Sequence, residues 1–328
     1  LKLEICRYLE RRMGLSYTPE ETMVTVGGSE AIDMMIRAVV DPGDEVLIPE
    51  PCYVSYDPIA RLSGAKVVSI PTRFEDDFRL TPEALKAAIT PKSKLLIFPY
   101  PNNPTGGIMR REDLEAIAEV LRGTNILVLS DEIYAELTYG GVKHVSIASI
   151  EGMRERTIVV NGFSKTYAMT GWRLGYAVGP APLIQQMLKI HQFAIMCAPT
   201  TSQYAAVDAL RNGDRDVELM RQSYDQRRRF LVHTFREMGL ECFEPFGAFY
   251  VFPSIKSLHM TSDEFAEKLL KAEKVAVVPG TAFGDCGEGF LRISYAYSLE
   301  ELKEATGRIA RFVKKCREAQ NTKEAKDA

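Results

Sequence analysis

Residues 126–134 read ILVLSDEIY, a continuous apolar run that ends on a carboxylate. Apolar residues at every position, instead of every second one, are typical of a strand buried on both faces, as in a parallel sheet covered by helices. A second run of this kind, LLIF, occupies residues 95–98. Burying the carboxylate of Asp131 at the end of such a strand is costly unless it meets a cation. Asp131 is therefore either one half of a structural salt bridge or part of a functional site.

Similar short runs alternate with amphipathic stretches along the first half of the chain. The helix-like stretches cover residues 29–40, 82–89 and 110–121, and each lies between two short apolar runs. Alternation of this kind predicts the α/β class, with a mostly parallel central sheet covered by helices. The expected strands of this sheet are residues 23–26, 45–48, 66–70, 94–98, 126–130, 157–160 and 174–178.

The pattern changes beyond Ala181, where longer helical stretches follow one another up to about residue 240. Because a single hydrophobic core stops growing near about 250–300 residues, a chain of 328 residues predicts two domains. We expect a large domain over residues 1–225 and a smaller α+β domain over residues 226–328, joined by a helix. Isolated strands of the smaller domain are expected near residues 248–252, 275–278 and 290–294.

Composition excludes several classes of function. Lys+Arg 41 against Asp+Glu 44 gives a formal net charge of −3, which lacks the basic field that nucleic-acid binding requires. No apolar run approaches the ~20 residues of a membrane span, so neither a nucleic-acid nor a membrane partner is expected. The four histidines lie far apart, so no metal site is expected. Six scattered cysteines without a C-x-x-C pair indicate reduced thiols and predict a cytoplasmic protein.

The chain begins within a periodic stretch, LKLEICRYLERRMGL, in which Leu1, Ile5 and Leu9 repeat at helical spacing. Neither a Met nor a capping residue precedes this stretch. We therefore expect the chain to be part of a longer protein.

The residues that follow each expected strand are candidates for function, because ligands of open α/β sheets bind beyond the carboxyl ends of the strands. Gly27, Gly28 and Ser29 open a helix after the first strand, and such a start can bind phosphate. A simple helix cap by Ser29 is the alternative. Lys165 follows the strand at 157–160 among small and apolar residues, which favours a lowered amine pKa and Schiff-base chemistry. A solvated surface charge is the alternative there.

An asparagine-containing loop and two arginines are further candidates. The loop at 99–107, PYPNNPTGG, is stiffened by three prolines, and its two adjacent residues Asn102 and Asn103 suggest an amide held in a fixed direction. A stiff loop without such a role is the alternative. Arg173 precedes a strand and either binds phosphate or lies at the surface. Arg292 lies inside an apolar strand and needs a bidentate partner, either a substrate carboxylate or an internal Asp or Glu.

Each of these features is weak evidence alone, but together they are specific. Tyr134 lies three residues after Asp131 and is near enough to face the same pocket. A phosphate cradle, an amide, a strand-end carboxylate, a tyrosine, a lysine and two arginines are the parts that hold pyridoxal phosphate and an amino acid.

Five longer motifs strengthen this interpretation: PNNPTG at 101–106, SDEIY at 130–134, SKTYAMTGWRLGY at 164–176, VVPGTAFG at 277–284 and FLRISYA at 290–296. On these motifs the sequence resembles the class I/II aminotransferases, which are fold-type-I pyridoxal-phosphate enzymes, and especially their bacterial aspartate and aromatic aminotransferase branch. The resemblance runs from about Leu1 to Phe312. It implies an aminotransferase that moves an amino group between an L-amino acid and a 2-keto acid by a ping-pong mechanism. It also implies a homodimer with active sites at the subunit interface.

The resemblance implies three catalytic residues. Lys165 would form the Schiff base with pyridoxal phosphate and, once displaced by the amino acid, would move a proton from its Cα. Asp131 would keep the pyridine nitrogen protonated, which makes the ring an electron sink. Tyr134 would donate a hydrogen bond to the phenolic oxygen of the ring.

The other implied roles concern binding. Asn103 would share the phenolic oxygen, and Tyr53 in EPCYVSY would stack on the ring and line the substrate side. Arg292 would hold the substrate α-carboxylate, with Asn103 assisting. The residues expected to hold the phosphate are Gly28, Ser29, Ser164 and Arg173.

Three departures from the family pattern affect these expectations. Gly162 stands three residues before the lysine, where many relatives carry a phosphate-binding hydroxyl that Ser164 could replace. Ser29 stands where some bacterial aspartate enzymes carry a lysine, so aromatic or broad neutral substrates are favoured over aspartate. The family segment before Leu1, which completes the small domain, touches substrate and lends a tyrosine to the neighbouring subunit, is not part of this sequence. Whether the chain turns over without that segment is open.

Two other functions remain open at this point. A C–S β-lyase that uses pyridoxal phosphate would share every cofactor residue and differ in its products, pyruvate and ammonia. A non-catalytic, aminotransferase-like sensing domain of a bacterial transcription regulator would keep Lys165 but would need a DNA-binding domain upstream. The sequence leaves the amino donor, the keto-acid acceptor and the pathway open.

Overall fold

Seven strands form the central sheet of the computed structural model, which describes the backbone of residues 1–327 and the side chains of residues 1–321. The strand order is β1-β7-β6-β5-β4-β2-β3. Neighbours from β6 to β3 are parallel, whereas β7 runs antiparallel to both β6 and β1. The strands are β1 (Thr22–Thr25), β2 (Glu45–Glu50), β3 (Lys66–Pro71), β4 (Ser93–Phe98), β5 (Leu127–Asp131), β6 (Thr157–Gly162) and β7 (Gly175–Val178).

Helices cover both faces of this sheet, which explains the continuous apolar runs. Successive strand residues point to opposite faces, so Leu95 and Ile97 of β4 pack with one set of helices while Leu96 and Phe98 pack with another. The first set is α2 (Gly28–Val39), α3 (Tyr56–Leu62) and α7 (Ala181–Ala194). The second face is covered by α4 (Pro82–Ala88) and α5 (Arg111–Leu121), and beside them by α1 (Lys2–Met13) and α8 (Thr200–Asn212).

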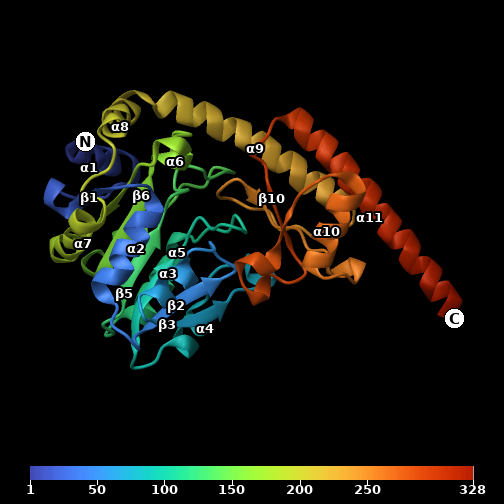
Figure 1. Ribbon diagram of the computed structural model, residues 1–328, viewed down its shortest axis with the longest axis horizontal. Coiled ribbons are helices and arrows are strands. Elements are labelled where there is room, and N and C mark those ends of the chain that lie inside the picture. The colour runs from blue at the N-terminus through green and yellow to red at the C-terminus, as the bar shows by residue number, and fades with distance from the viewer. Residues whose placement is uncertain (328) are drawn as a thin grey trace.

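The long helix α9 (Asp214–Glu237) leads from this body to a second, smaller sheet (Figure 1). That sheet has the antiparallel order β8-β10-β9, with β8 (Tyr250–Val251), β9 (Val278–Pro279) and β10 (Leu291–Ser294). Its core is shared with three helices: α9, α10 (Ser262–Glu273) and α11 (Leu299–Asp327).

The predicted α/β class, with a mostly parallel central sheet and a smaller α+β part, is confirmed. The strand expected at 275–278 was wrong in extent, because only Val278 and Pro279 are paired. Lys274 ends α10 in a left-handed conformation with φ 57°, so the chain must leave the helix before it can pair with β10. Residues 275–277 therefore run along the edge of the small sheet without a strand partner.

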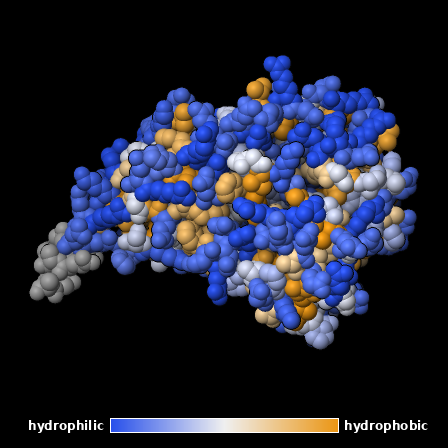
Figure 2. Space-filling view, turned by 180° about the vertical axis from the view of Figure 1, so that it is seen from behind, coloured by the Kyte–Doolittle hydropathy of each residue, from blue (hydrophilic) through white to orange (hydrophobic). Residues whose placement is uncertain are grey.

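The face of the molecule that is turned away from the viewer in Figure 1 is mostly hydrophilic, with apolar residues in several smaller patches (Figure 2). Within the described residues, none of the helices combines the length and the apolar character that crossing a membrane requires.

Candidate active site

A cavity of ≈ 320 Å³ opens at the carboxyl ends of the central strands. It receives residues from the ends of β4, β5 and β6, from the start of α2 and from β8 and β10 of the smaller sheet. The structure brings every site residue expected from the sequence into its lining: Gly28, Ser29, Tyr53, Asn103, Asp131, Tyr134, Ser164, Lys165, Arg173 and Arg292.

Lys165 lies in the one-turn helix α6 (Phe163–Thr166), directly after β6. Its Nζ lies 6.0 Å from the ring centroid of Tyr134 and 5.5 Å from that of Phe249. Burial lowers the pKa of the Lys165 amine, and the positive charges of Arg173 and Arg292 lower it further. The amine is therefore more readily uncharged, and so nucleophilic, than that of a surface lysine.

Asp131 ends β5 as a buried carboxylate without an ion pair among the described residues. The Tyr56 hydroxyl donates to its Oδ2 at 2.6 Å, and the backbone N–H of Ile133 donates to its Oδ1 at 3.2 Å. Burial raises the pKa of the Asp131 carboxyl, against the effect of these two hydrogen bonds. The structural salt bridge considered as an alternative is not formed, so the carboxylate is available to a cation that enters the cavity.

Arg292 points into the cavity from β10. Its guanidinium carbon lies 4.7 Å from the ring centroid of Tyr250 and 4.8 Å from that of Phe283, so the group packs against two rings. One terminal nitrogen donates to Asn103 Oδ1 at 3.1 Å, whereas the buried Nε has no hydrogen-bond partner. No Asp or Glu of the described chain forms an ion pair with Arg292, which leaves a donor for an incoming carboxylate.

The two asparagines of the proline-rich loop have different roles. Asn102 is buried and holds the loop, since its Nδ2 donates to Pro51 O at 3.3 Å and its Oδ1 accepts from the Thr105 hydroxyl at 2.8 Å. Asn103 faces the cavity and contacts Arg292. The amide expected to point in a fixed direction is therefore Asn103, and Asn102 fixes the loop that carries it.

The start of α2 forms a concave cradle of backbone and cationic groups. The helix begins at Gly28, with Gly27 before it at φ 79°, so Ser29 lies inside the first turn instead of capping it. A Cβ on Gly27 would lie 2.9 Å from a guanidinium nitrogen of Arg173, and one on Gly175 would lie 2.6 Å from the carbonyl carbon of Gly27. Only glycine permits this approach, which places the N–H groups at the helix N-terminus beside the Arg173 cation.

Gly162 is a packing requirement of the same region. It pairs with Gly175 across β6 and β7, and a Cβ on it would lie 3.0 Å from Gly175 Cα and 3.1 Å from both Ile133 Cδ1 and Leu174 O. A hydroxyl residue at this position would therefore disturb the contact between the two strands. Ser164, two residues on, lines the cavity with its own hydroxyl.

Two tyrosines of the cavity were missed by sequence reasoning. Tyr56 stands three residues after Tyr53, and their rings form an edge-on contact with centroids 5.5 Å apart. Tyr250 lies on β8, and its hydroxyl is 3.0 Å from the hydroxyl of Tyr134. The stretch EPCYVSY contained the signal for Tyr56, since both aromatic residues follow the same strand end. Tyr250 carried no local signal, because the smaller sheet brings it to the site from more than a hundred residues away.

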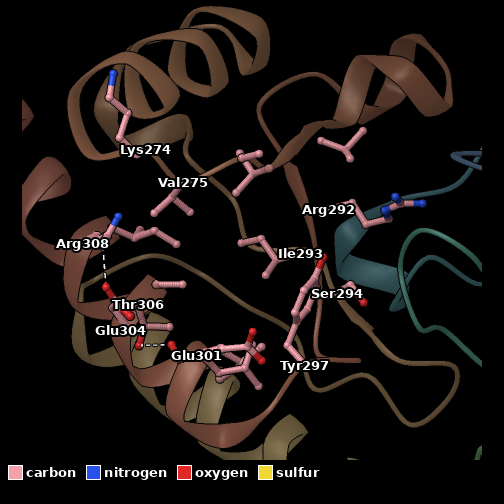
Figure 3. Close-up of a pocket in the computed structure, with 17 residues that line it drawn as sticks. Lys274, Val275, Arg292, Ile293, Ser294, Tyr297, Glu301, Glu304, Thr306 and Arg308 are labelled. Atoms are coloured by element: carbon pink, nitrogen blue, oxygen red, sulfur yellow. Dashed lines mark hydrogen bonds and ion pairs between the residues drawn. The ribbon is translucent and has the colours of Figure 1, made fainter.

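A second hollow of ≈ 410 Å³ lies against the smaller sheet, between residues 274–278, β10 and α11 (Figure 3). Val275 and Ile293 lie around it, whereas the guanidinium of Arg292 points away from it, toward loops of the first half of the chain. Neighbouring residues of a strand face opposite sides, so β10 presents Arg292 to one hollow and Ile293 to the other. Glu304 and Arg308 on its rim pair with each other on α11. Of the candidate site residues, Arg292 lines both hollows and the others line only the first.

The donor set of the first cavity fits pyridoxal phosphate. A buried carboxylate suits a protonated pyridine nitrogen, an amine of lowered pKa suits an aldehyde, and the cradle beside Arg173 suits a phosphate. The free Nε of Arg292 suits the carboxylate of an amino acid. The arrangement can therefore hold a cofactor of this kind together with an amino-acid substrate.

Comparison with known proteins agrees with this chemistry. The family model for aminotransferase class I and II matches residues 1–309. The chain is 52% identical over 316 residues to the YugH protein of Bacillus subtilis and 46% identical over 317 residues to an aspartate aminotransferase of Pyrococcus abyssi, covering in each case 96% of this chain and 82% of that protein. The solved aromatic aminotransferase of Pyrococcus horikoshii superposes with a TM-score of 0.94 at 45% identity, covering 96% of this chain and 85% of that one. The chain thus belongs to the class I and II aminotransferases, which are enzymes that depend on pyridoxal phosphate.

Proposed function

We propose that this chain binds pyridoxal phosphate through Lys165 and moves an amino group between an L-amino acid and a 2-keto acid by a ping-pong mechanism. The observation that carries the proposal is one cavity that holds an amine of lowered pKa, an unpaired buried carboxylate and an arginine with a free donor. Relatives at this level of identity are named as aminotransferases, so we set aside the reading as a non-catalytic sensing domain.

Each residue of the cavity has a binding role under this proposal. Asp131 would face the pyridine nitrogen, Tyr53 would stack on the ring, and Tyr134 would donate to the phenolic oxygen with Asn103 beside it. The residues that would hold the phosphate line the cradle: Gly28, Ser29, Ser164 and Arg173.

The chemistry is divided between the cofactor and the protein. Pyridoxal phosphate, when bound, supplies an electron sink for the negative charge that develops at the substrate Cα. Asp131 would hold a proton on the ring nitrogen, which maintains this electron sink. Arg292 orients the substrate by its α-carboxylate, and Lys165 Nζ, uncharged, takes the proton from Cα. Release of the keto acid precedes binding of the second substrate, which predicts ping-pong kinetics.

We propose aromatic or broad neutral amino acids as the preferred substrates over aspartate. Three cations line the cavity as described, Lys165, Arg173 and Arg292, and each is engaged by the cofactor or the α-carboxylate. Among the described residues of one chain, none remains in the cavity lining for a carboxylate on the substrate side chain, and Ser29 supplies only a hydroxyl. Aspartate and aromatic aminotransferases both occur among the similar proteins, so a comparison of kcat/KM for phenylalanine and aspartate tests this point.

We propose a homodimer with the active sites at its interface. Phe193, Met196 and Tyr204, at and after the end of α7, are 94%, 76% and 77% exposed. Exposed apolar residues concentrated in this way mark protein interfaces. The helix α8, which carries Tyr204, is tied to the residue before Arg173, because the Ser202 hydroxyl donates to the carbonyl of Trp172 at 2.7 Å. Sedimentation of the protein and of Phe193→Asp tests the dimer: the variant should sediment as a monomer.

We propose the domain division 1–225 and 226–328, which falls within α9, and a cytoplasmic location. The separate cores of the two sheets support the division. The six cysteines, all free, support a reducing compartment.

Product analysis and one substitution test the proposed function. The chain loaded with pyridoxal phosphate should convert an amino acid to its keto acid and leave the aminated cofactor, whereas pyruvate with ammonia from a cysteine-like substrate would indicate a C–S β-lyase. Lys165→Ala should abolish the half-reaction. Lys189→Ala, at an exposed lysine of α7, is the control and should keep it.

A further inference from the structure

Tyr250 of β8 contacts both the cofactor side and the substrate side of the cavity. Resting on the proposed function, we propose that Tyr250 is a positioning residue of the reaction: its hydroxyl donates to the hydroxyl of Tyr134, and its ring holds the guanidinium of Arg292. One side chain from the smaller sheet thereby sets how strongly Tyr134 donates to the cofactor and how Arg292 is oriented toward the substrate carboxylate.

The contact between the two hydroxyls determines which tyrosine donates and which accepts. The hydroxyls of Tyr134 and Tyr250 lie 3.0 Å apart, and neither has another hydrogen-bond partner among the described residues. A tyrosine hydroxyl carries a single proton. If Tyr134 gives its proton to the phenolic oxygen of the cofactor, it can only accept from Tyr250, which must be the donor. Accepting this bond makes Tyr134 a stronger donor in turn, because linked hydrogen bonds polarise one another.

Both hydroxyls remain protonated over the working range of pH. Burial raises the pKa of Tyr134 well above its ordinary value, and burial also raises that of Tyr250. The charged and titratable groups that face the pair come from several elements: Tyr53, Asp131, Lys165, Tyr224 and Arg292. The negative charge of Asp131 raises the pKa of Tyr134 and the positive charge of Arg292 lowers it, so this pKa depends on charges at both ends of the cavity.

The ring of Tyr250 restricts Arg292 from one side. Its centroid lies 4.7 Å from the guanidinium carbon, the centroid of Phe283 lies 4.8 Å from the same atom, and Asn103 accepts from one terminal nitrogen. A guanidinium held in this way keeps its plane fixed while its Nε stays free. The ring therefore presents the remaining donors of Arg292 to a carboxylate in one orientation.

Two substitutions separate the hydroxyl from the ring. Tyr250→Phe keeps the ring and removes the donor, whereas Tyr250→Leu removes both. The matched control is Tyr295→Phe, which removes a buried hydroxyl of the same core that donates to Ala248 O at 3.2 Å and does not line the cavity. Each protein is loaded with pyridoxal phosphate, and the visible absorbance of the bound cofactor is titrated with pH. The KM and kcat for the best amino acid are then measured.

Tyr250→Phe should raise the midpoint pH of the visible-band titration by about half to one pH unit. The reason is that the hydrogen bond from Tyr134 to the phenolic oxygen, which favours the more negative form of the bound cofactor, is weakened. Its KM should stay within about twofold of the unmodified protein, because the ring is kept. Tyr250→Leu should show the same spectral shift and raise KM by about tenfold, the scale of one desolvated cation–π contact. Tyr295→Phe should change neither quantity.

A Tyr250→Phe protein whose band titrates at the unmodified pH would overturn the inference while leaving the proposed function intact. Equal shifts in Tyr250→Phe and Tyr295→Phe would also overturn it, since they would reflect general loosening of the core. If the unmodified chain forms no visible band with pyridoxal phosphate, the proposed function fails and the inference fails with it. The presence or absence of a visible band in the unmodified protein therefore distinguishes failure of the inference alone from failure of the proposed function.

Discussion

The Tyr56 hydroxyl donates to the Asp131 carboxylate across 2.6 Å, and this neutral donor stands where an ion pair would be expected for a buried carboxylate. The protein thus buries a carboxyl group without a cationic partner, since no ion pair of the described residues includes Asp131. A buried charge costs folding free energy, so this arrangement is understandable if the charge is used by a bound cation. The protonated ring nitrogen of pyridoxal phosphate is such a cation.

Asp131→Asn tests this use directly. The amide can still accept from Tyr56 but carries no charge to hold a proton on the ring nitrogen. We expect kcat to fall by about a hundredfold or more, the scale of losing one electrostatic contact at a reacting centre. Steady-state kinetics with saturating cofactor measure this, and unchanged kcat would remove Asp131 from the mechanism.

The same substitution should stabilise the cofactor-free protein. Burial raises the pKa of Asp131 above its value in the unfolded chain, so stability that is present below the unfolded pKa is lost as pH rises through the folded pKa. Removing the charge should raise Tm at pH 7, and the gain should shrink to zero as pH falls below about 4. Thermal unfolding at both pH values checks the sign; a lower Tm for Asp131→Asn at pH 7 would contradict the account.

Capture of pyridoxal phosphate by Lys165 should depend on pH in a defined direction. Only the uncharged amine attacks an aldehyde, and burial lowers the pKa of Lys165. The rate of capture by the cofactor-free chain should therefore rise with pH and level off before exposed lysines lose their protons, near about 10.4. Stopped-flow absorbance measures this rate. A rate that keeps rising through the ordinary lysine range would show that the amine is not perturbed.

Arg292→Leu should impair substrate binding and leave cofactor binding intact. The substitution keeps side-chain bulk against Tyr250 and Phe283 but removes the guanidinium donors for the α-carboxylate. We expect KM to rise by about 30- to 100-fold, corresponding to loss of a charge-assisted, bidentate contact. Arg229→Leu, at a largely exposed arginine of α9, is the control and should keep KM. Equal KM values for the two variants would refute the role of Arg292.

Gly162→Ser should destabilise the protein instead of improving phosphate binding. The added Cβ would crowd Gly175, Ile133 and Leu174 at 3.0–3.1 Å, and overpacking of this kind costs about 1–3 kcal/mol. Gly171→Ser is the control, because a Cβ there meets nothing within 4 Å. Thermal unfolding and titration with pyridoxal phosphate report the two effects. A Gly162→Ser protein of unchanged Tm that binds the cofactor more tightly would contradict this reading.

Much of the fold and site could be predicted from the sequence because the signals are local. Continuous apolar runs such as LLIF revealed buried parallel strands, and the residues after the strand ends, Lys165 and Asp131 among them, were therefore expected at one edge of the sheet. The structure places them in one cavity, and the expected family is confirmed by the match over residues 1–309.

Features that depend on distant contacts could not be predicted. Tyr250 reaches Tyr134 over 116 residues of sequence, through a two-residue strand that leaves almost no pattern. The reason for Gly162 lies in its partner Gly175 on the neighbouring strand, which only the register of β6 and β7 reveals. The short β9 follows from the left-handed turn at Lys274, a conformation without a clear sequence signal in a non-glycine residue.

The visible absorbance spectrum of the purified chain with pyridoxal phosphate, recorded before and after single amino acids are added, shows whether Lys165 binds the cofactor and whether the amino group is transferred. We expect a visible band that depends on Lys165 and that phenylalanine, tyrosine or glutamate converts to the spectrum of the aminated cofactor, with release of the keto acid. Absence of a band at saturating pyridoxal phosphate would contradict the assignment of Lys165. A band that no amino acid changes would contradict the proposed transamination.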